Sequence, residues 1–225
     1  MSTLPGPGLA LEPGPLPELK DVYWRHRVDP GSLRRDGRVW TLSTVGQVVP
    51  FLAFAVFLGV AAPITIPLAV ILLVHAWMVP ALYAARGANV VRPKRRDSAP
   101  AAEQRALGML ADLLDREAYA LYMRTGLALE PGALGVWLIG ESGALLLAPG
   151  GRRVHCYCVA VRDPGLPVAD RVAHLLLALR CDENGFATVA NRAFVGAPWR
   201  LRLVSRARPA LDVAVARARA LAVSG

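Results

Sequence analysis

A long stretch of this sequence lacks charged side chains. From Val39 to Ala85 there is no Asp, Glu, Lys or Arg, and these residues would make about 70 Å of helix at about 1.5 Å per residue. One crossing of a lipid hydrocarbon core takes about 20 apolar residues, so the stretch is long enough for two crossings. The absence of charge therefore favours a pair of membrane-spanning helices.

Other absences limit the classes of protein to consider. The chain has only three cysteines. Residues Met1 to Pro17 are rich in Pro and Gly and contain no apolar secretory leader, so we expect this segment to be disordered. A disulfide framework is therefore not expected. The sequence contains no Walker loop, dinucleotide fingerprint, H-E-x-x-H zinc motif or EF-hand loop. These absences favour a protein that is not an enzyme and needs no cofactor.

Proline divides the uncharged stretch. Pro63 lies near its middle and predicts a tight turn between two helices, Trp40–Ala61 and Ile64–Ala84. Each helix has about the length of one span. Aromatic rings at the outer ends, such as Trp40 and Tyr83, are typical of the level of the lipid headgroups.

Basic residues near the spans predict the orientation. They are Arg25, Arg27, Arg34, Arg35 and Arg38 before the first span and Arg86, Arg92, Lys94, Arg95 and Arg96 after the second. The connecting turn has none, so the positive-inside rule places both termini in the cytoplasm at the inner (plasma) membrane. Two alternatives stay open: a re-entrant or interfacial hairpin that does not cross, and a core hairpin of a soluble protein.

Polar side chains are rare within the predicted spans. His75 and Gln47 are the two strongly polar ones, and such groups are costly to place in a membrane. We expect them to form hydrogen bonds between the two helices. The alternative is that they line the path of a small oligomeric transporter or channel, of which this chain would be a subunit. Since two helices alone cannot enclose a pore, this alternative requires a homo-oligomer.

The composition divides the chain into five segments. We expect a disordered, basic cytoplasmic segment at 1–38, a transmembrane helical hairpin at 39–85, a basic linker at 86–101, a cytoplasmic α+β domain at 102–194 and a basic helical extension at 195–225. The fold class expected for the whole chain is thus α+β.

Hydrophobic periodicity predicts the elements of the soluble part. Apolar residues at helical spacing predict helices over Ala102–Arg124, Val168–Arg180, Gly185–Phe194 and Pro209–Val223, the first ending at Gly126 as a C-cap. Apolar runs broken by glycine predict three strands, at about Leu134–Ile139, Ala144–Leu147 and Arg153–Val161. A three-stranded antiparallel sheet packed by helices follows.

Several short motifs together resemble a known bacterial domain. They include Tyr122-x-x-x-Gly126, Cys156-Tyr-Cys158 and Asp182-Glu-x-x-Phe186 within residues 103–194. The segment resembles an uncharacterised domain of unknown function seen in membrane-anchored proteins of high-GC Gram-positive bacteria. The resemblance implies a similar architecture and assigns no activity.

Cysteine and histidine form one potential metal site. A four-ligand zinc site would combine Cys156, Cys158, His174 and Cys181. However, a C-x-C pair within a strand is a poor chelate, since zinc sites usually begin with two ligands on a turn. We expect cysteines that pack in the core, and a membrane-tethered enzyme or thiol/metal site centred on Cys156 and Cys158 is the alternative.

Two further motifs are expected to be structural. Gly140-Glu-Ser-Gly-Ala144 resembles a nucleophile elbow but lies in a predicted β-hairpin, so it is expected to be a turn. Asp182 and Glu183 are expected to cap a helix and face solvent. A carboxylate pair for acid–base catalysis is less favoured, since no His or Lys lies near them in sequence.

The C-terminal part is strongly basic. After Glu183 the chain has a single acid, Asp212, among many arginines, and anionic lipid headgroups attract such a surface. The residues expected to face lipid are Arg92, Lys94, Arg95, Arg96, Arg200 and Arg202. No nucleic-acid-binding motif accompanies the charge, so nucleic acid is not expected as a partner. Taken together, the sequence predicts a membrane-anchored cytoplasmic binding or scaffolding module with an unknown protein partner.

Overall fold

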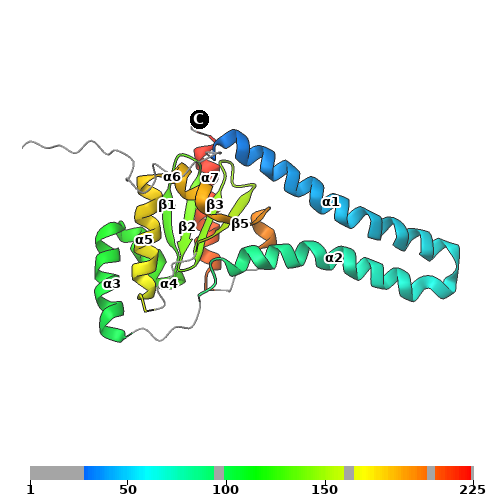
Figure 1. Ribbon diagram of the computed structural model, residues 1–225, viewed down its shortest axis with the longest axis horizontal. Coiled ribbons are helices and arrows are strands. Elements are labelled where there is room, and N and C mark those ends of the chain that lie inside the picture. Colours follow the sequence, from blue (N-terminus) through cyan, green and yellow to red (C-terminus); the bar gives the residue numbers. More distant parts are fainter. Residues whose placement is uncertain (1–27, 94–98, 160–164, 202–205, 224–225) are drawn as a thin grey trace, which may run out of the picture.

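The computed structural model describes residues 28–93, 99–159, 165–201 and 206–223. These form a mixed α+β fold with two long apolar helices that extend away from a layered domain (Figure 1). In chain order the helices are α1 (Pro30–Ala61), η2 (Pro63–Thr65), α2 (Ile66–Asn89), α3 (Pro100–Leu113), α4 (Arg116–Thr125), α5 (Val168–Cys181), α6 (Glu183–Val189), η3 (Pro198–Arg200) and α7 (Arg208–Leu221). The strands are β1 (Ala128–Pro131), β2 (Val136–Gly140), β3 (Gly143–Leu147), β4 (Val154–Cys158) and β5 (Asn191–Gly196).

The two apolar helices form an antiparallel hairpin with a tight tip. Pro63 begins the 3-10 turn η2 between them, as the sequence predicts. The Thr65 hydroxyl lies within hydrogen-bond distance of the Leu58 and Ala62 carbonyls and can donate to either of them, which helps to satisfy the last carbonyls of α1. Both helices are long and apolar enough to cross a membrane, and only 6% and 11% of their most apolar stretches are buried.

The first helix begins earlier than the sequence predicts. Asp29 accepts a hydrogen bond from the Ser32 backbone, and the Ser32 side chain accepts one from the Asp29 backbone, so a capping box starts α1 at Pro30. Val28 and Leu33 are buried in the domain core. The prediction that residues 1–38 are disordered is therefore wrong from residue 28 onward.

The sheet has five antiparallel strands in the order β1-β2-β3-β4-β5. The three predicted strands correspond to β2, β3 and β4, so the prediction of a three-stranded sheet is wrong. Strand β1 lies in a region where the sequence predicts no element, and β5 occupies the end of the predicted helix Gly185–Phe194. Only the first part of the predicted helix is helical, as the end of α6.

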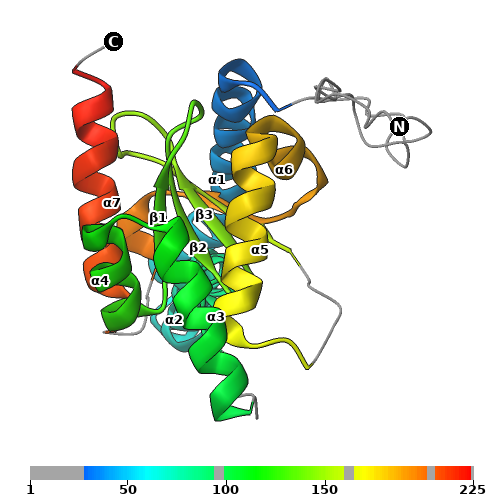
Figure 2. The same ribbon diagram turned by 90° about the vertical axis from the view of Figure 1, so that its left-hand side faces the viewer.

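Helices cover both faces of this sheet (Figure 2). Helices α3, α5 and α6 pack on one face, together with the first turns of α1. Helix α7 and the end of α2 pack on the other, and α4 contributes Ala118 and Tyr122 to the first cluster and Leu121 to the second. The segment 195–225 is thus no separate extension, because α7 buries Ala210, Leu211, Ala214 and Ala218 in the core.

Two further boundaries differ from the prediction. The helix predicted at Ala102–Arg124 is two helices, because Asp115 caps a new helix with its side chain bonded to the Ala118 backbone. Gly126 ends α4 in the left-handed conformation, as predicted. The predicted linker 86–101 begins too early: α2 continues to Asn89, and Val90 and Val91 are buried against the sheet.

Candidate functional site

The hairpin is held tightly at the β4–β5 edge of the sheet. A Cβ atom on Gly87 of α2 would lie 2.8 Å from the Phe194 Cβ and 2.9 Å from the Cys156 Sγ. The Trp40 ring of α1 packs edge-on against Phe194 and Tyr83, with centroid distances of 6.1 and 6.0 Å. The junction of hairpin and domain is therefore a packed interface and not a flexible tether.

Three hollows surround Trp199 at this junction. The largest, about 720 Å³, lies between α7 and the β3–β4 turn and has three arginines and one acid in its lining. A second, about 310 Å³, lies between residues 40–45 of α1, residues 80–83 of α2, the β3–β4 turn and the β5–η3 segment. A third, about 340 Å³, follows α2 beside Trp77. Trp199 is 79% exposed and lines all three.

Arginine and aromatic side chains meet in the second hollow, called here the junction groove. Arg152 and Arg153 reach it from the β3–β4 turn, and Arg200 reaches it from η3. The Arg200 guanidinium lies 5.2 Å from the centroid of the Trp199 ring, within the range of a cation–π interaction. An arginine-rich groove with aromatic walls can hold an anionic group.

The structure places two of the residues predicted to face lipid. Arg200 lines the junction groove and Arg92 is exposed just after α2. Lys94, Arg95, Arg96 and Arg202 lie outside the described residues. Sequence analysis missed Arg152 and Arg153, since nothing local connects the β3–β4 turn with the hairpin.

A second polar cluster lies where α1 crosses the sheet edge, with His155 and Tyr157 buried and Asp36 and Arg192 half-buried. Asp36 of α1 forms an ion pair with Arg192 of β5 at 2.5 Å, and Tyr157 lies opposite Arg192 in the sheet register. The His155 Nδ1, Tyr157 hydroxyl and Arg192 Nε atoms are buried without a hydrogen-bond partner among the described residues. The alternation along β4 could have indicated that His155 and Tyr157 share a face, but their partners are distant in sequence.

Burial sets the protonation of this cluster. Burial, followed by the positive charge of Arg192, lowers the pKa of His155 to about 4. Burial also raises the pKa of Tyr157 to about 12. At neutral pH both groups are therefore uncharged.

The predicted cysteine and histidine ligands do not come together. Cys156 is buried against Gly87, whereas Cys158 is exposed at the end of β4. Cys181 is exposed at the end of α5 and His174 is exposed on the same helix. Among the residues that the structure describes, no three His, Cys, Asp or Glu side chains are placed to hold a metal ion. Burial raises the pKa of the Cys156 thiol, which disfavours the thiolate that catalysis would need.

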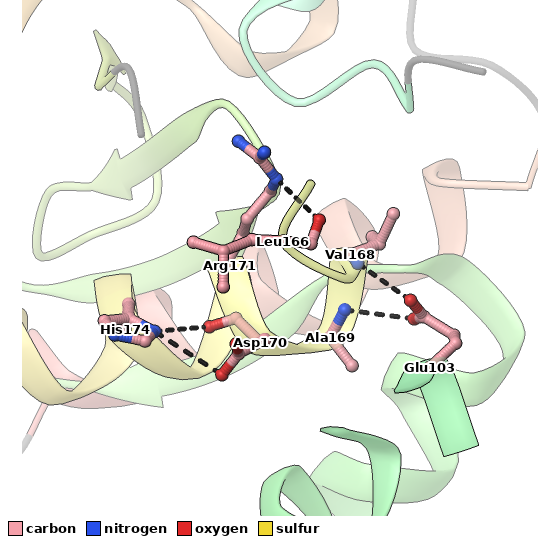
Figure 3. A network of polar contacts seen from close by, with 7 residues as sticks. All are labelled: Glu103, Leu166, Val168, Ala169, Asp170, Arg171 and His174. Atoms are coloured by element: carbon pink, nitrogen blue, oxygen red, sulfur yellow. Dashed lines mark hydrogen bonds and ion pairs between the residues drawn. The ribbon is translucent and has the colours of Figure 1, made fainter. Parts of the chain in front are cut away.

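His174 belongs to a network that fixes the start of α5 (Figure 3). Its Nδ1 lies 3.5 Å from the Asp170 carboxylate. Glu103 of α3 accepts hydrogen bonds from the backbone N–H groups of Val168 and Ala169, at 2.8 and 3.0 Å. A carboxylate at a helix N-terminus satisfies free donors and complements the helix dipole. The network is therefore a structural clamp between two helices.

The two motifs with a catalytic alternative are also structural. Gly140 and Gly143 lie directly opposite in the register of β2 and β3, so this segment is the predicted hairpin turn. Asp182 caps α6 through the Gly185 backbone, as predicted. Glu183 is not solvated as expected: it accepts hydrogen bonds from the Ala133 and Leu134 backbone and from the Trp137 indole.

His75 and Gln47 are the two strongly polar side chains of the hairpin. His75 Nδ1 lies 2.9 Å from the Ile71 carbonyl of its own helix, and its ring stacks on Phe51 of α1 at a centroid distance of 5.9 Å. The contact between the helices at His75 is thus ring stacking and not the hydrogen bond that we expected. Gln47 is exposed on α1.

Comparisons with known proteins add no assignment. The chain matches no family model, no curated protein and no solved structure. The resemblance over residues 103–194 therefore stays a prediction.

Proposed function

We propose that this protein is a membrane-anchored binding or scaffolding module without catalytic activity. Its hairpin crosses the inner membrane, both termini lie in the cytoplasm, and the domain binds a protein partner there. The observation that supports this most is the packing of both hairpin helices against the β4–β5 edge. Such packing would fix the domain at the membrane surface and present its other surfaces in a constant orientation.

The exposed apolar surface of the hairpin supports the membrane placement. Phe54, Phe57 and Val60 are each more than 60% exposed, and large contiguous apolar surfaces on soluble monomers are rare. The arginines near the domain end of the hairpin support the orientation by the positive-inside rule. The alternative of a re-entrant hairpin differs only in whether the tip emerges on the other side.

Thiol labelling tests the placement directly. Cys158 and Cys181 are exposed in the domain and Ile64 is 88% exposed at the tip. A membrane-impermeant maleimide applied to intact cells should leave the native protein unlabelled. The Ile64→Cys variant, in a Cys158→Ser/Cys181→Ser background, should be labelled. Labelling of the tip only in opened cells would contradict two full crossings.

Crosslinking tests the binding role. The full-length protein would be crosslinked in its membrane, captured by affinity, and analysed for partner proteins and metal in one sample. We expect a stoichiometric protein partner and no bound metal. About one zinc ion per chain, lost in the Cys156→Ser/Cys158→Ser variant, would contradict the proposal and support the thiol/metal alternative.

A further inference from the structure

The junction groove is open to the level at which the hairpin becomes apolar. It is lined by Trp40 and Thr44 near the start of the uncharged stretch of α1 and by Pro80 and Tyr83 near its end on α2. Aromatic rings at these positions are typical of the boundary between headgroups and hydrocarbon. If the hairpin crosses the membrane as proposed above, the groove lies in the headgroup layer of the cytoplasmic leaflet.

The charge of the groove favours an anion. Arg152, Arg153 and Arg200 line it, and no acidic side chain does among the described residues. None of the three arginines forms an ion pair within the described part of the chain. Guanidinium groups bind phosphate in a bidentate manner, so three of them around one hollow suit a phosphate-bearing group.

A second, mostly apolar hollow adjoins the junction groove along α2. The hollow beside α2 shares Pro80, Trp199 and Arg200 with the junction groove, and its other lining residues are Trp77, Ala81 and Ala84. It runs from the arginines toward the apolar middle of α2, which is the direction that an acyl chain takes from its headgroup. A soluble phosphate compound would leave this hollow unused.

We propose that the junction groove binds one anionic phospholipid of the cytoplasmic leaflet. Arg152, Arg153 and Arg200 contact the phosphate of the headgroup, and an acyl chain lies along α2 beside Trp77. This inference rests on the proposed membrane placement. It goes beyond a general attraction between basic residues and the bilayer, because it predicts a single saturable site and one bound lipid per chain.

The test uses the full-length protein in detergent, titrated with phosphatidylglycerol or phosphatidylcholine and analysed by native mass spectrometry. The Arg152→Gln/Arg200→Gln variant changes two exposed side chains, so its fold should be kept. At about 1 kcal/mol per basic residue it should bind phosphatidylglycerol about 25-fold more weakly. The Arg105→Gln/Arg116→Gln variant is the matched control: it removes the same charge from exposed positions of α3 and α4 and should bind like the native chain.

Three outcomes would overturn the proposal. One is equal retention of the two lipids by the native protein, and another is equal loss of binding in both double variants. The third is displacement of phosphatidylglycerol by glycerol phosphate at equal concentration, which would indicate a soluble phosphate ligand instead. Incorporation of the same samples into phosphatidylcholine nanodiscs separates the two proposals. Protein that incorporates but does not prefer the anionic lipid contradicts only the lipid site, whereas protein that does not incorporate contradicts the membrane placement.

Discussion

At the scale of single residues, Glu183 illustrates how one carboxylate can connect distant segments. It accepts hydrogen bonds from the backbone N–H groups of Ala133 and Leu134, at 2.7 and 3.0 Å, and from the Trp137 indole at 2.6 Å. The Glu183→Gln variant keeps the size but turns an NH₂ group toward these donors. We expect a loss of about 1–3 kcal/mol in the free energy of unfolding, measured by urea denaturation followed by circular dichroism.

Glu117 provides the control for this prediction. Its side chain is 88% exposed and its ion pair with Arg217 is long, at 3.7 Å. Exposed pairs contribute little to stability, so Glu117→Gln should change the free energy of unfolding by less than about 0.5 kcal/mol. Equal effects of the two substitutions would show that the three hydrogen bonds of Glu183 do not stabilise the fold.

His155 predicts a specific dependence of stability on pH. Its pKa is lowered to about 4 in the fold, against about 6.5 in an unfolded chain. Between these values the unfolded state binds more protons, so stability falls as the pH falls from about 6.5 toward about 4. The loss due to this group should approach about 3 kcal/mol at the lower end.

The His155→Phe variant isolates that contribution, because a phenyl ring can keep the stacking on Tyr157. The difference in unfolding free energy between native protein and variant should be constant above about pH 6.5. Toward pH 4 the native protein should lose about 3 kcal/mol relative to the variant. A constant difference across the whole pH range would contradict the assigned pKa.

The sequence could reveal only part of these sites. It indicated that Cys156 and Cys158 share a face of β4 and that C-x-C in a strand is a poor chelate. It could not reveal that Asp36 and Arg192 approach His155, since α1 and β5 meet β4 only through long-range packing. Arg200 could be predicted from charge alone, whereas the groove that it lines depends on four separate segments.

At the scale of elements, two glycines should respond to alanine in opposite directions. A Cβ on Gly87 of α2 would overlap Phe194 and Cys156 at less than 3 Å, whereas one on Gly108 of α3 would meet nothing within 4 Å. We expect Gly87→Ala to cost about 1–3 kcal/mol through overpacking and Gly108→Ala to gain about 0.5–1 kcal/mol through helix propensity. Thermal unfolding of the two purified variants measures both effects. A stabilised Gly87→Ala variant would contradict the close packing of α2 on the sheet.

Elements were predictable where the local pattern was strong. The hairpin, its turn at Pro63 and strands β2, β3 and β4 follow from long apolar runs and from glycine and proline breaks. Strand β5 was missed because a short Ala- and Phe-containing segment next to α6 fits helical and strand periodicity equally well. It becomes a strand because it pairs with β4. The break between α3 and α4 did have a local signal, the N-cap Asp115.

At the scale of the whole molecule, hairpin and domain share one core. Val28, just before α1, and Leu33, in its first turn, belong to the apolar cluster on one face of the sheet. Ala84 of α2 and Val90 and Val91, which follow α2, belong to the cluster on the other face. The composition suggests an anchor followed by an independent domain. This division does not fit the structure, because residues at the two ends of the hairpin belong to the apolar clusters on both faces of the sheet.

Removal of the hairpin should therefore destabilise the domain. A fragment that starts at Ala99 lacks the buried side chains of Val28, Leu33, Val90 and Val91, each of which contributes about 1.5–3 kcal/mol by burial. Because whole domains are stable by only about 5–15 kcal/mol, we expect the fragment to unfold at a much lower temperature. It should also expose Cys156, whose thiol lies against Gly87 in the full chain.

Maleimide labelling measures the exposure of Cys156 in a Cys158→Ser/Cys181→Ser background, where Cys156 is the remaining cysteine. Cys156 should stay unlabelled in the folded full-length protein and react readily in the fragment. Equal protection in both, together with an unchanged melting temperature, would contradict the shared core. Residues 99–225 would then form an independent domain, and the proposed constant orientation at a membrane surface would lose its structural basis.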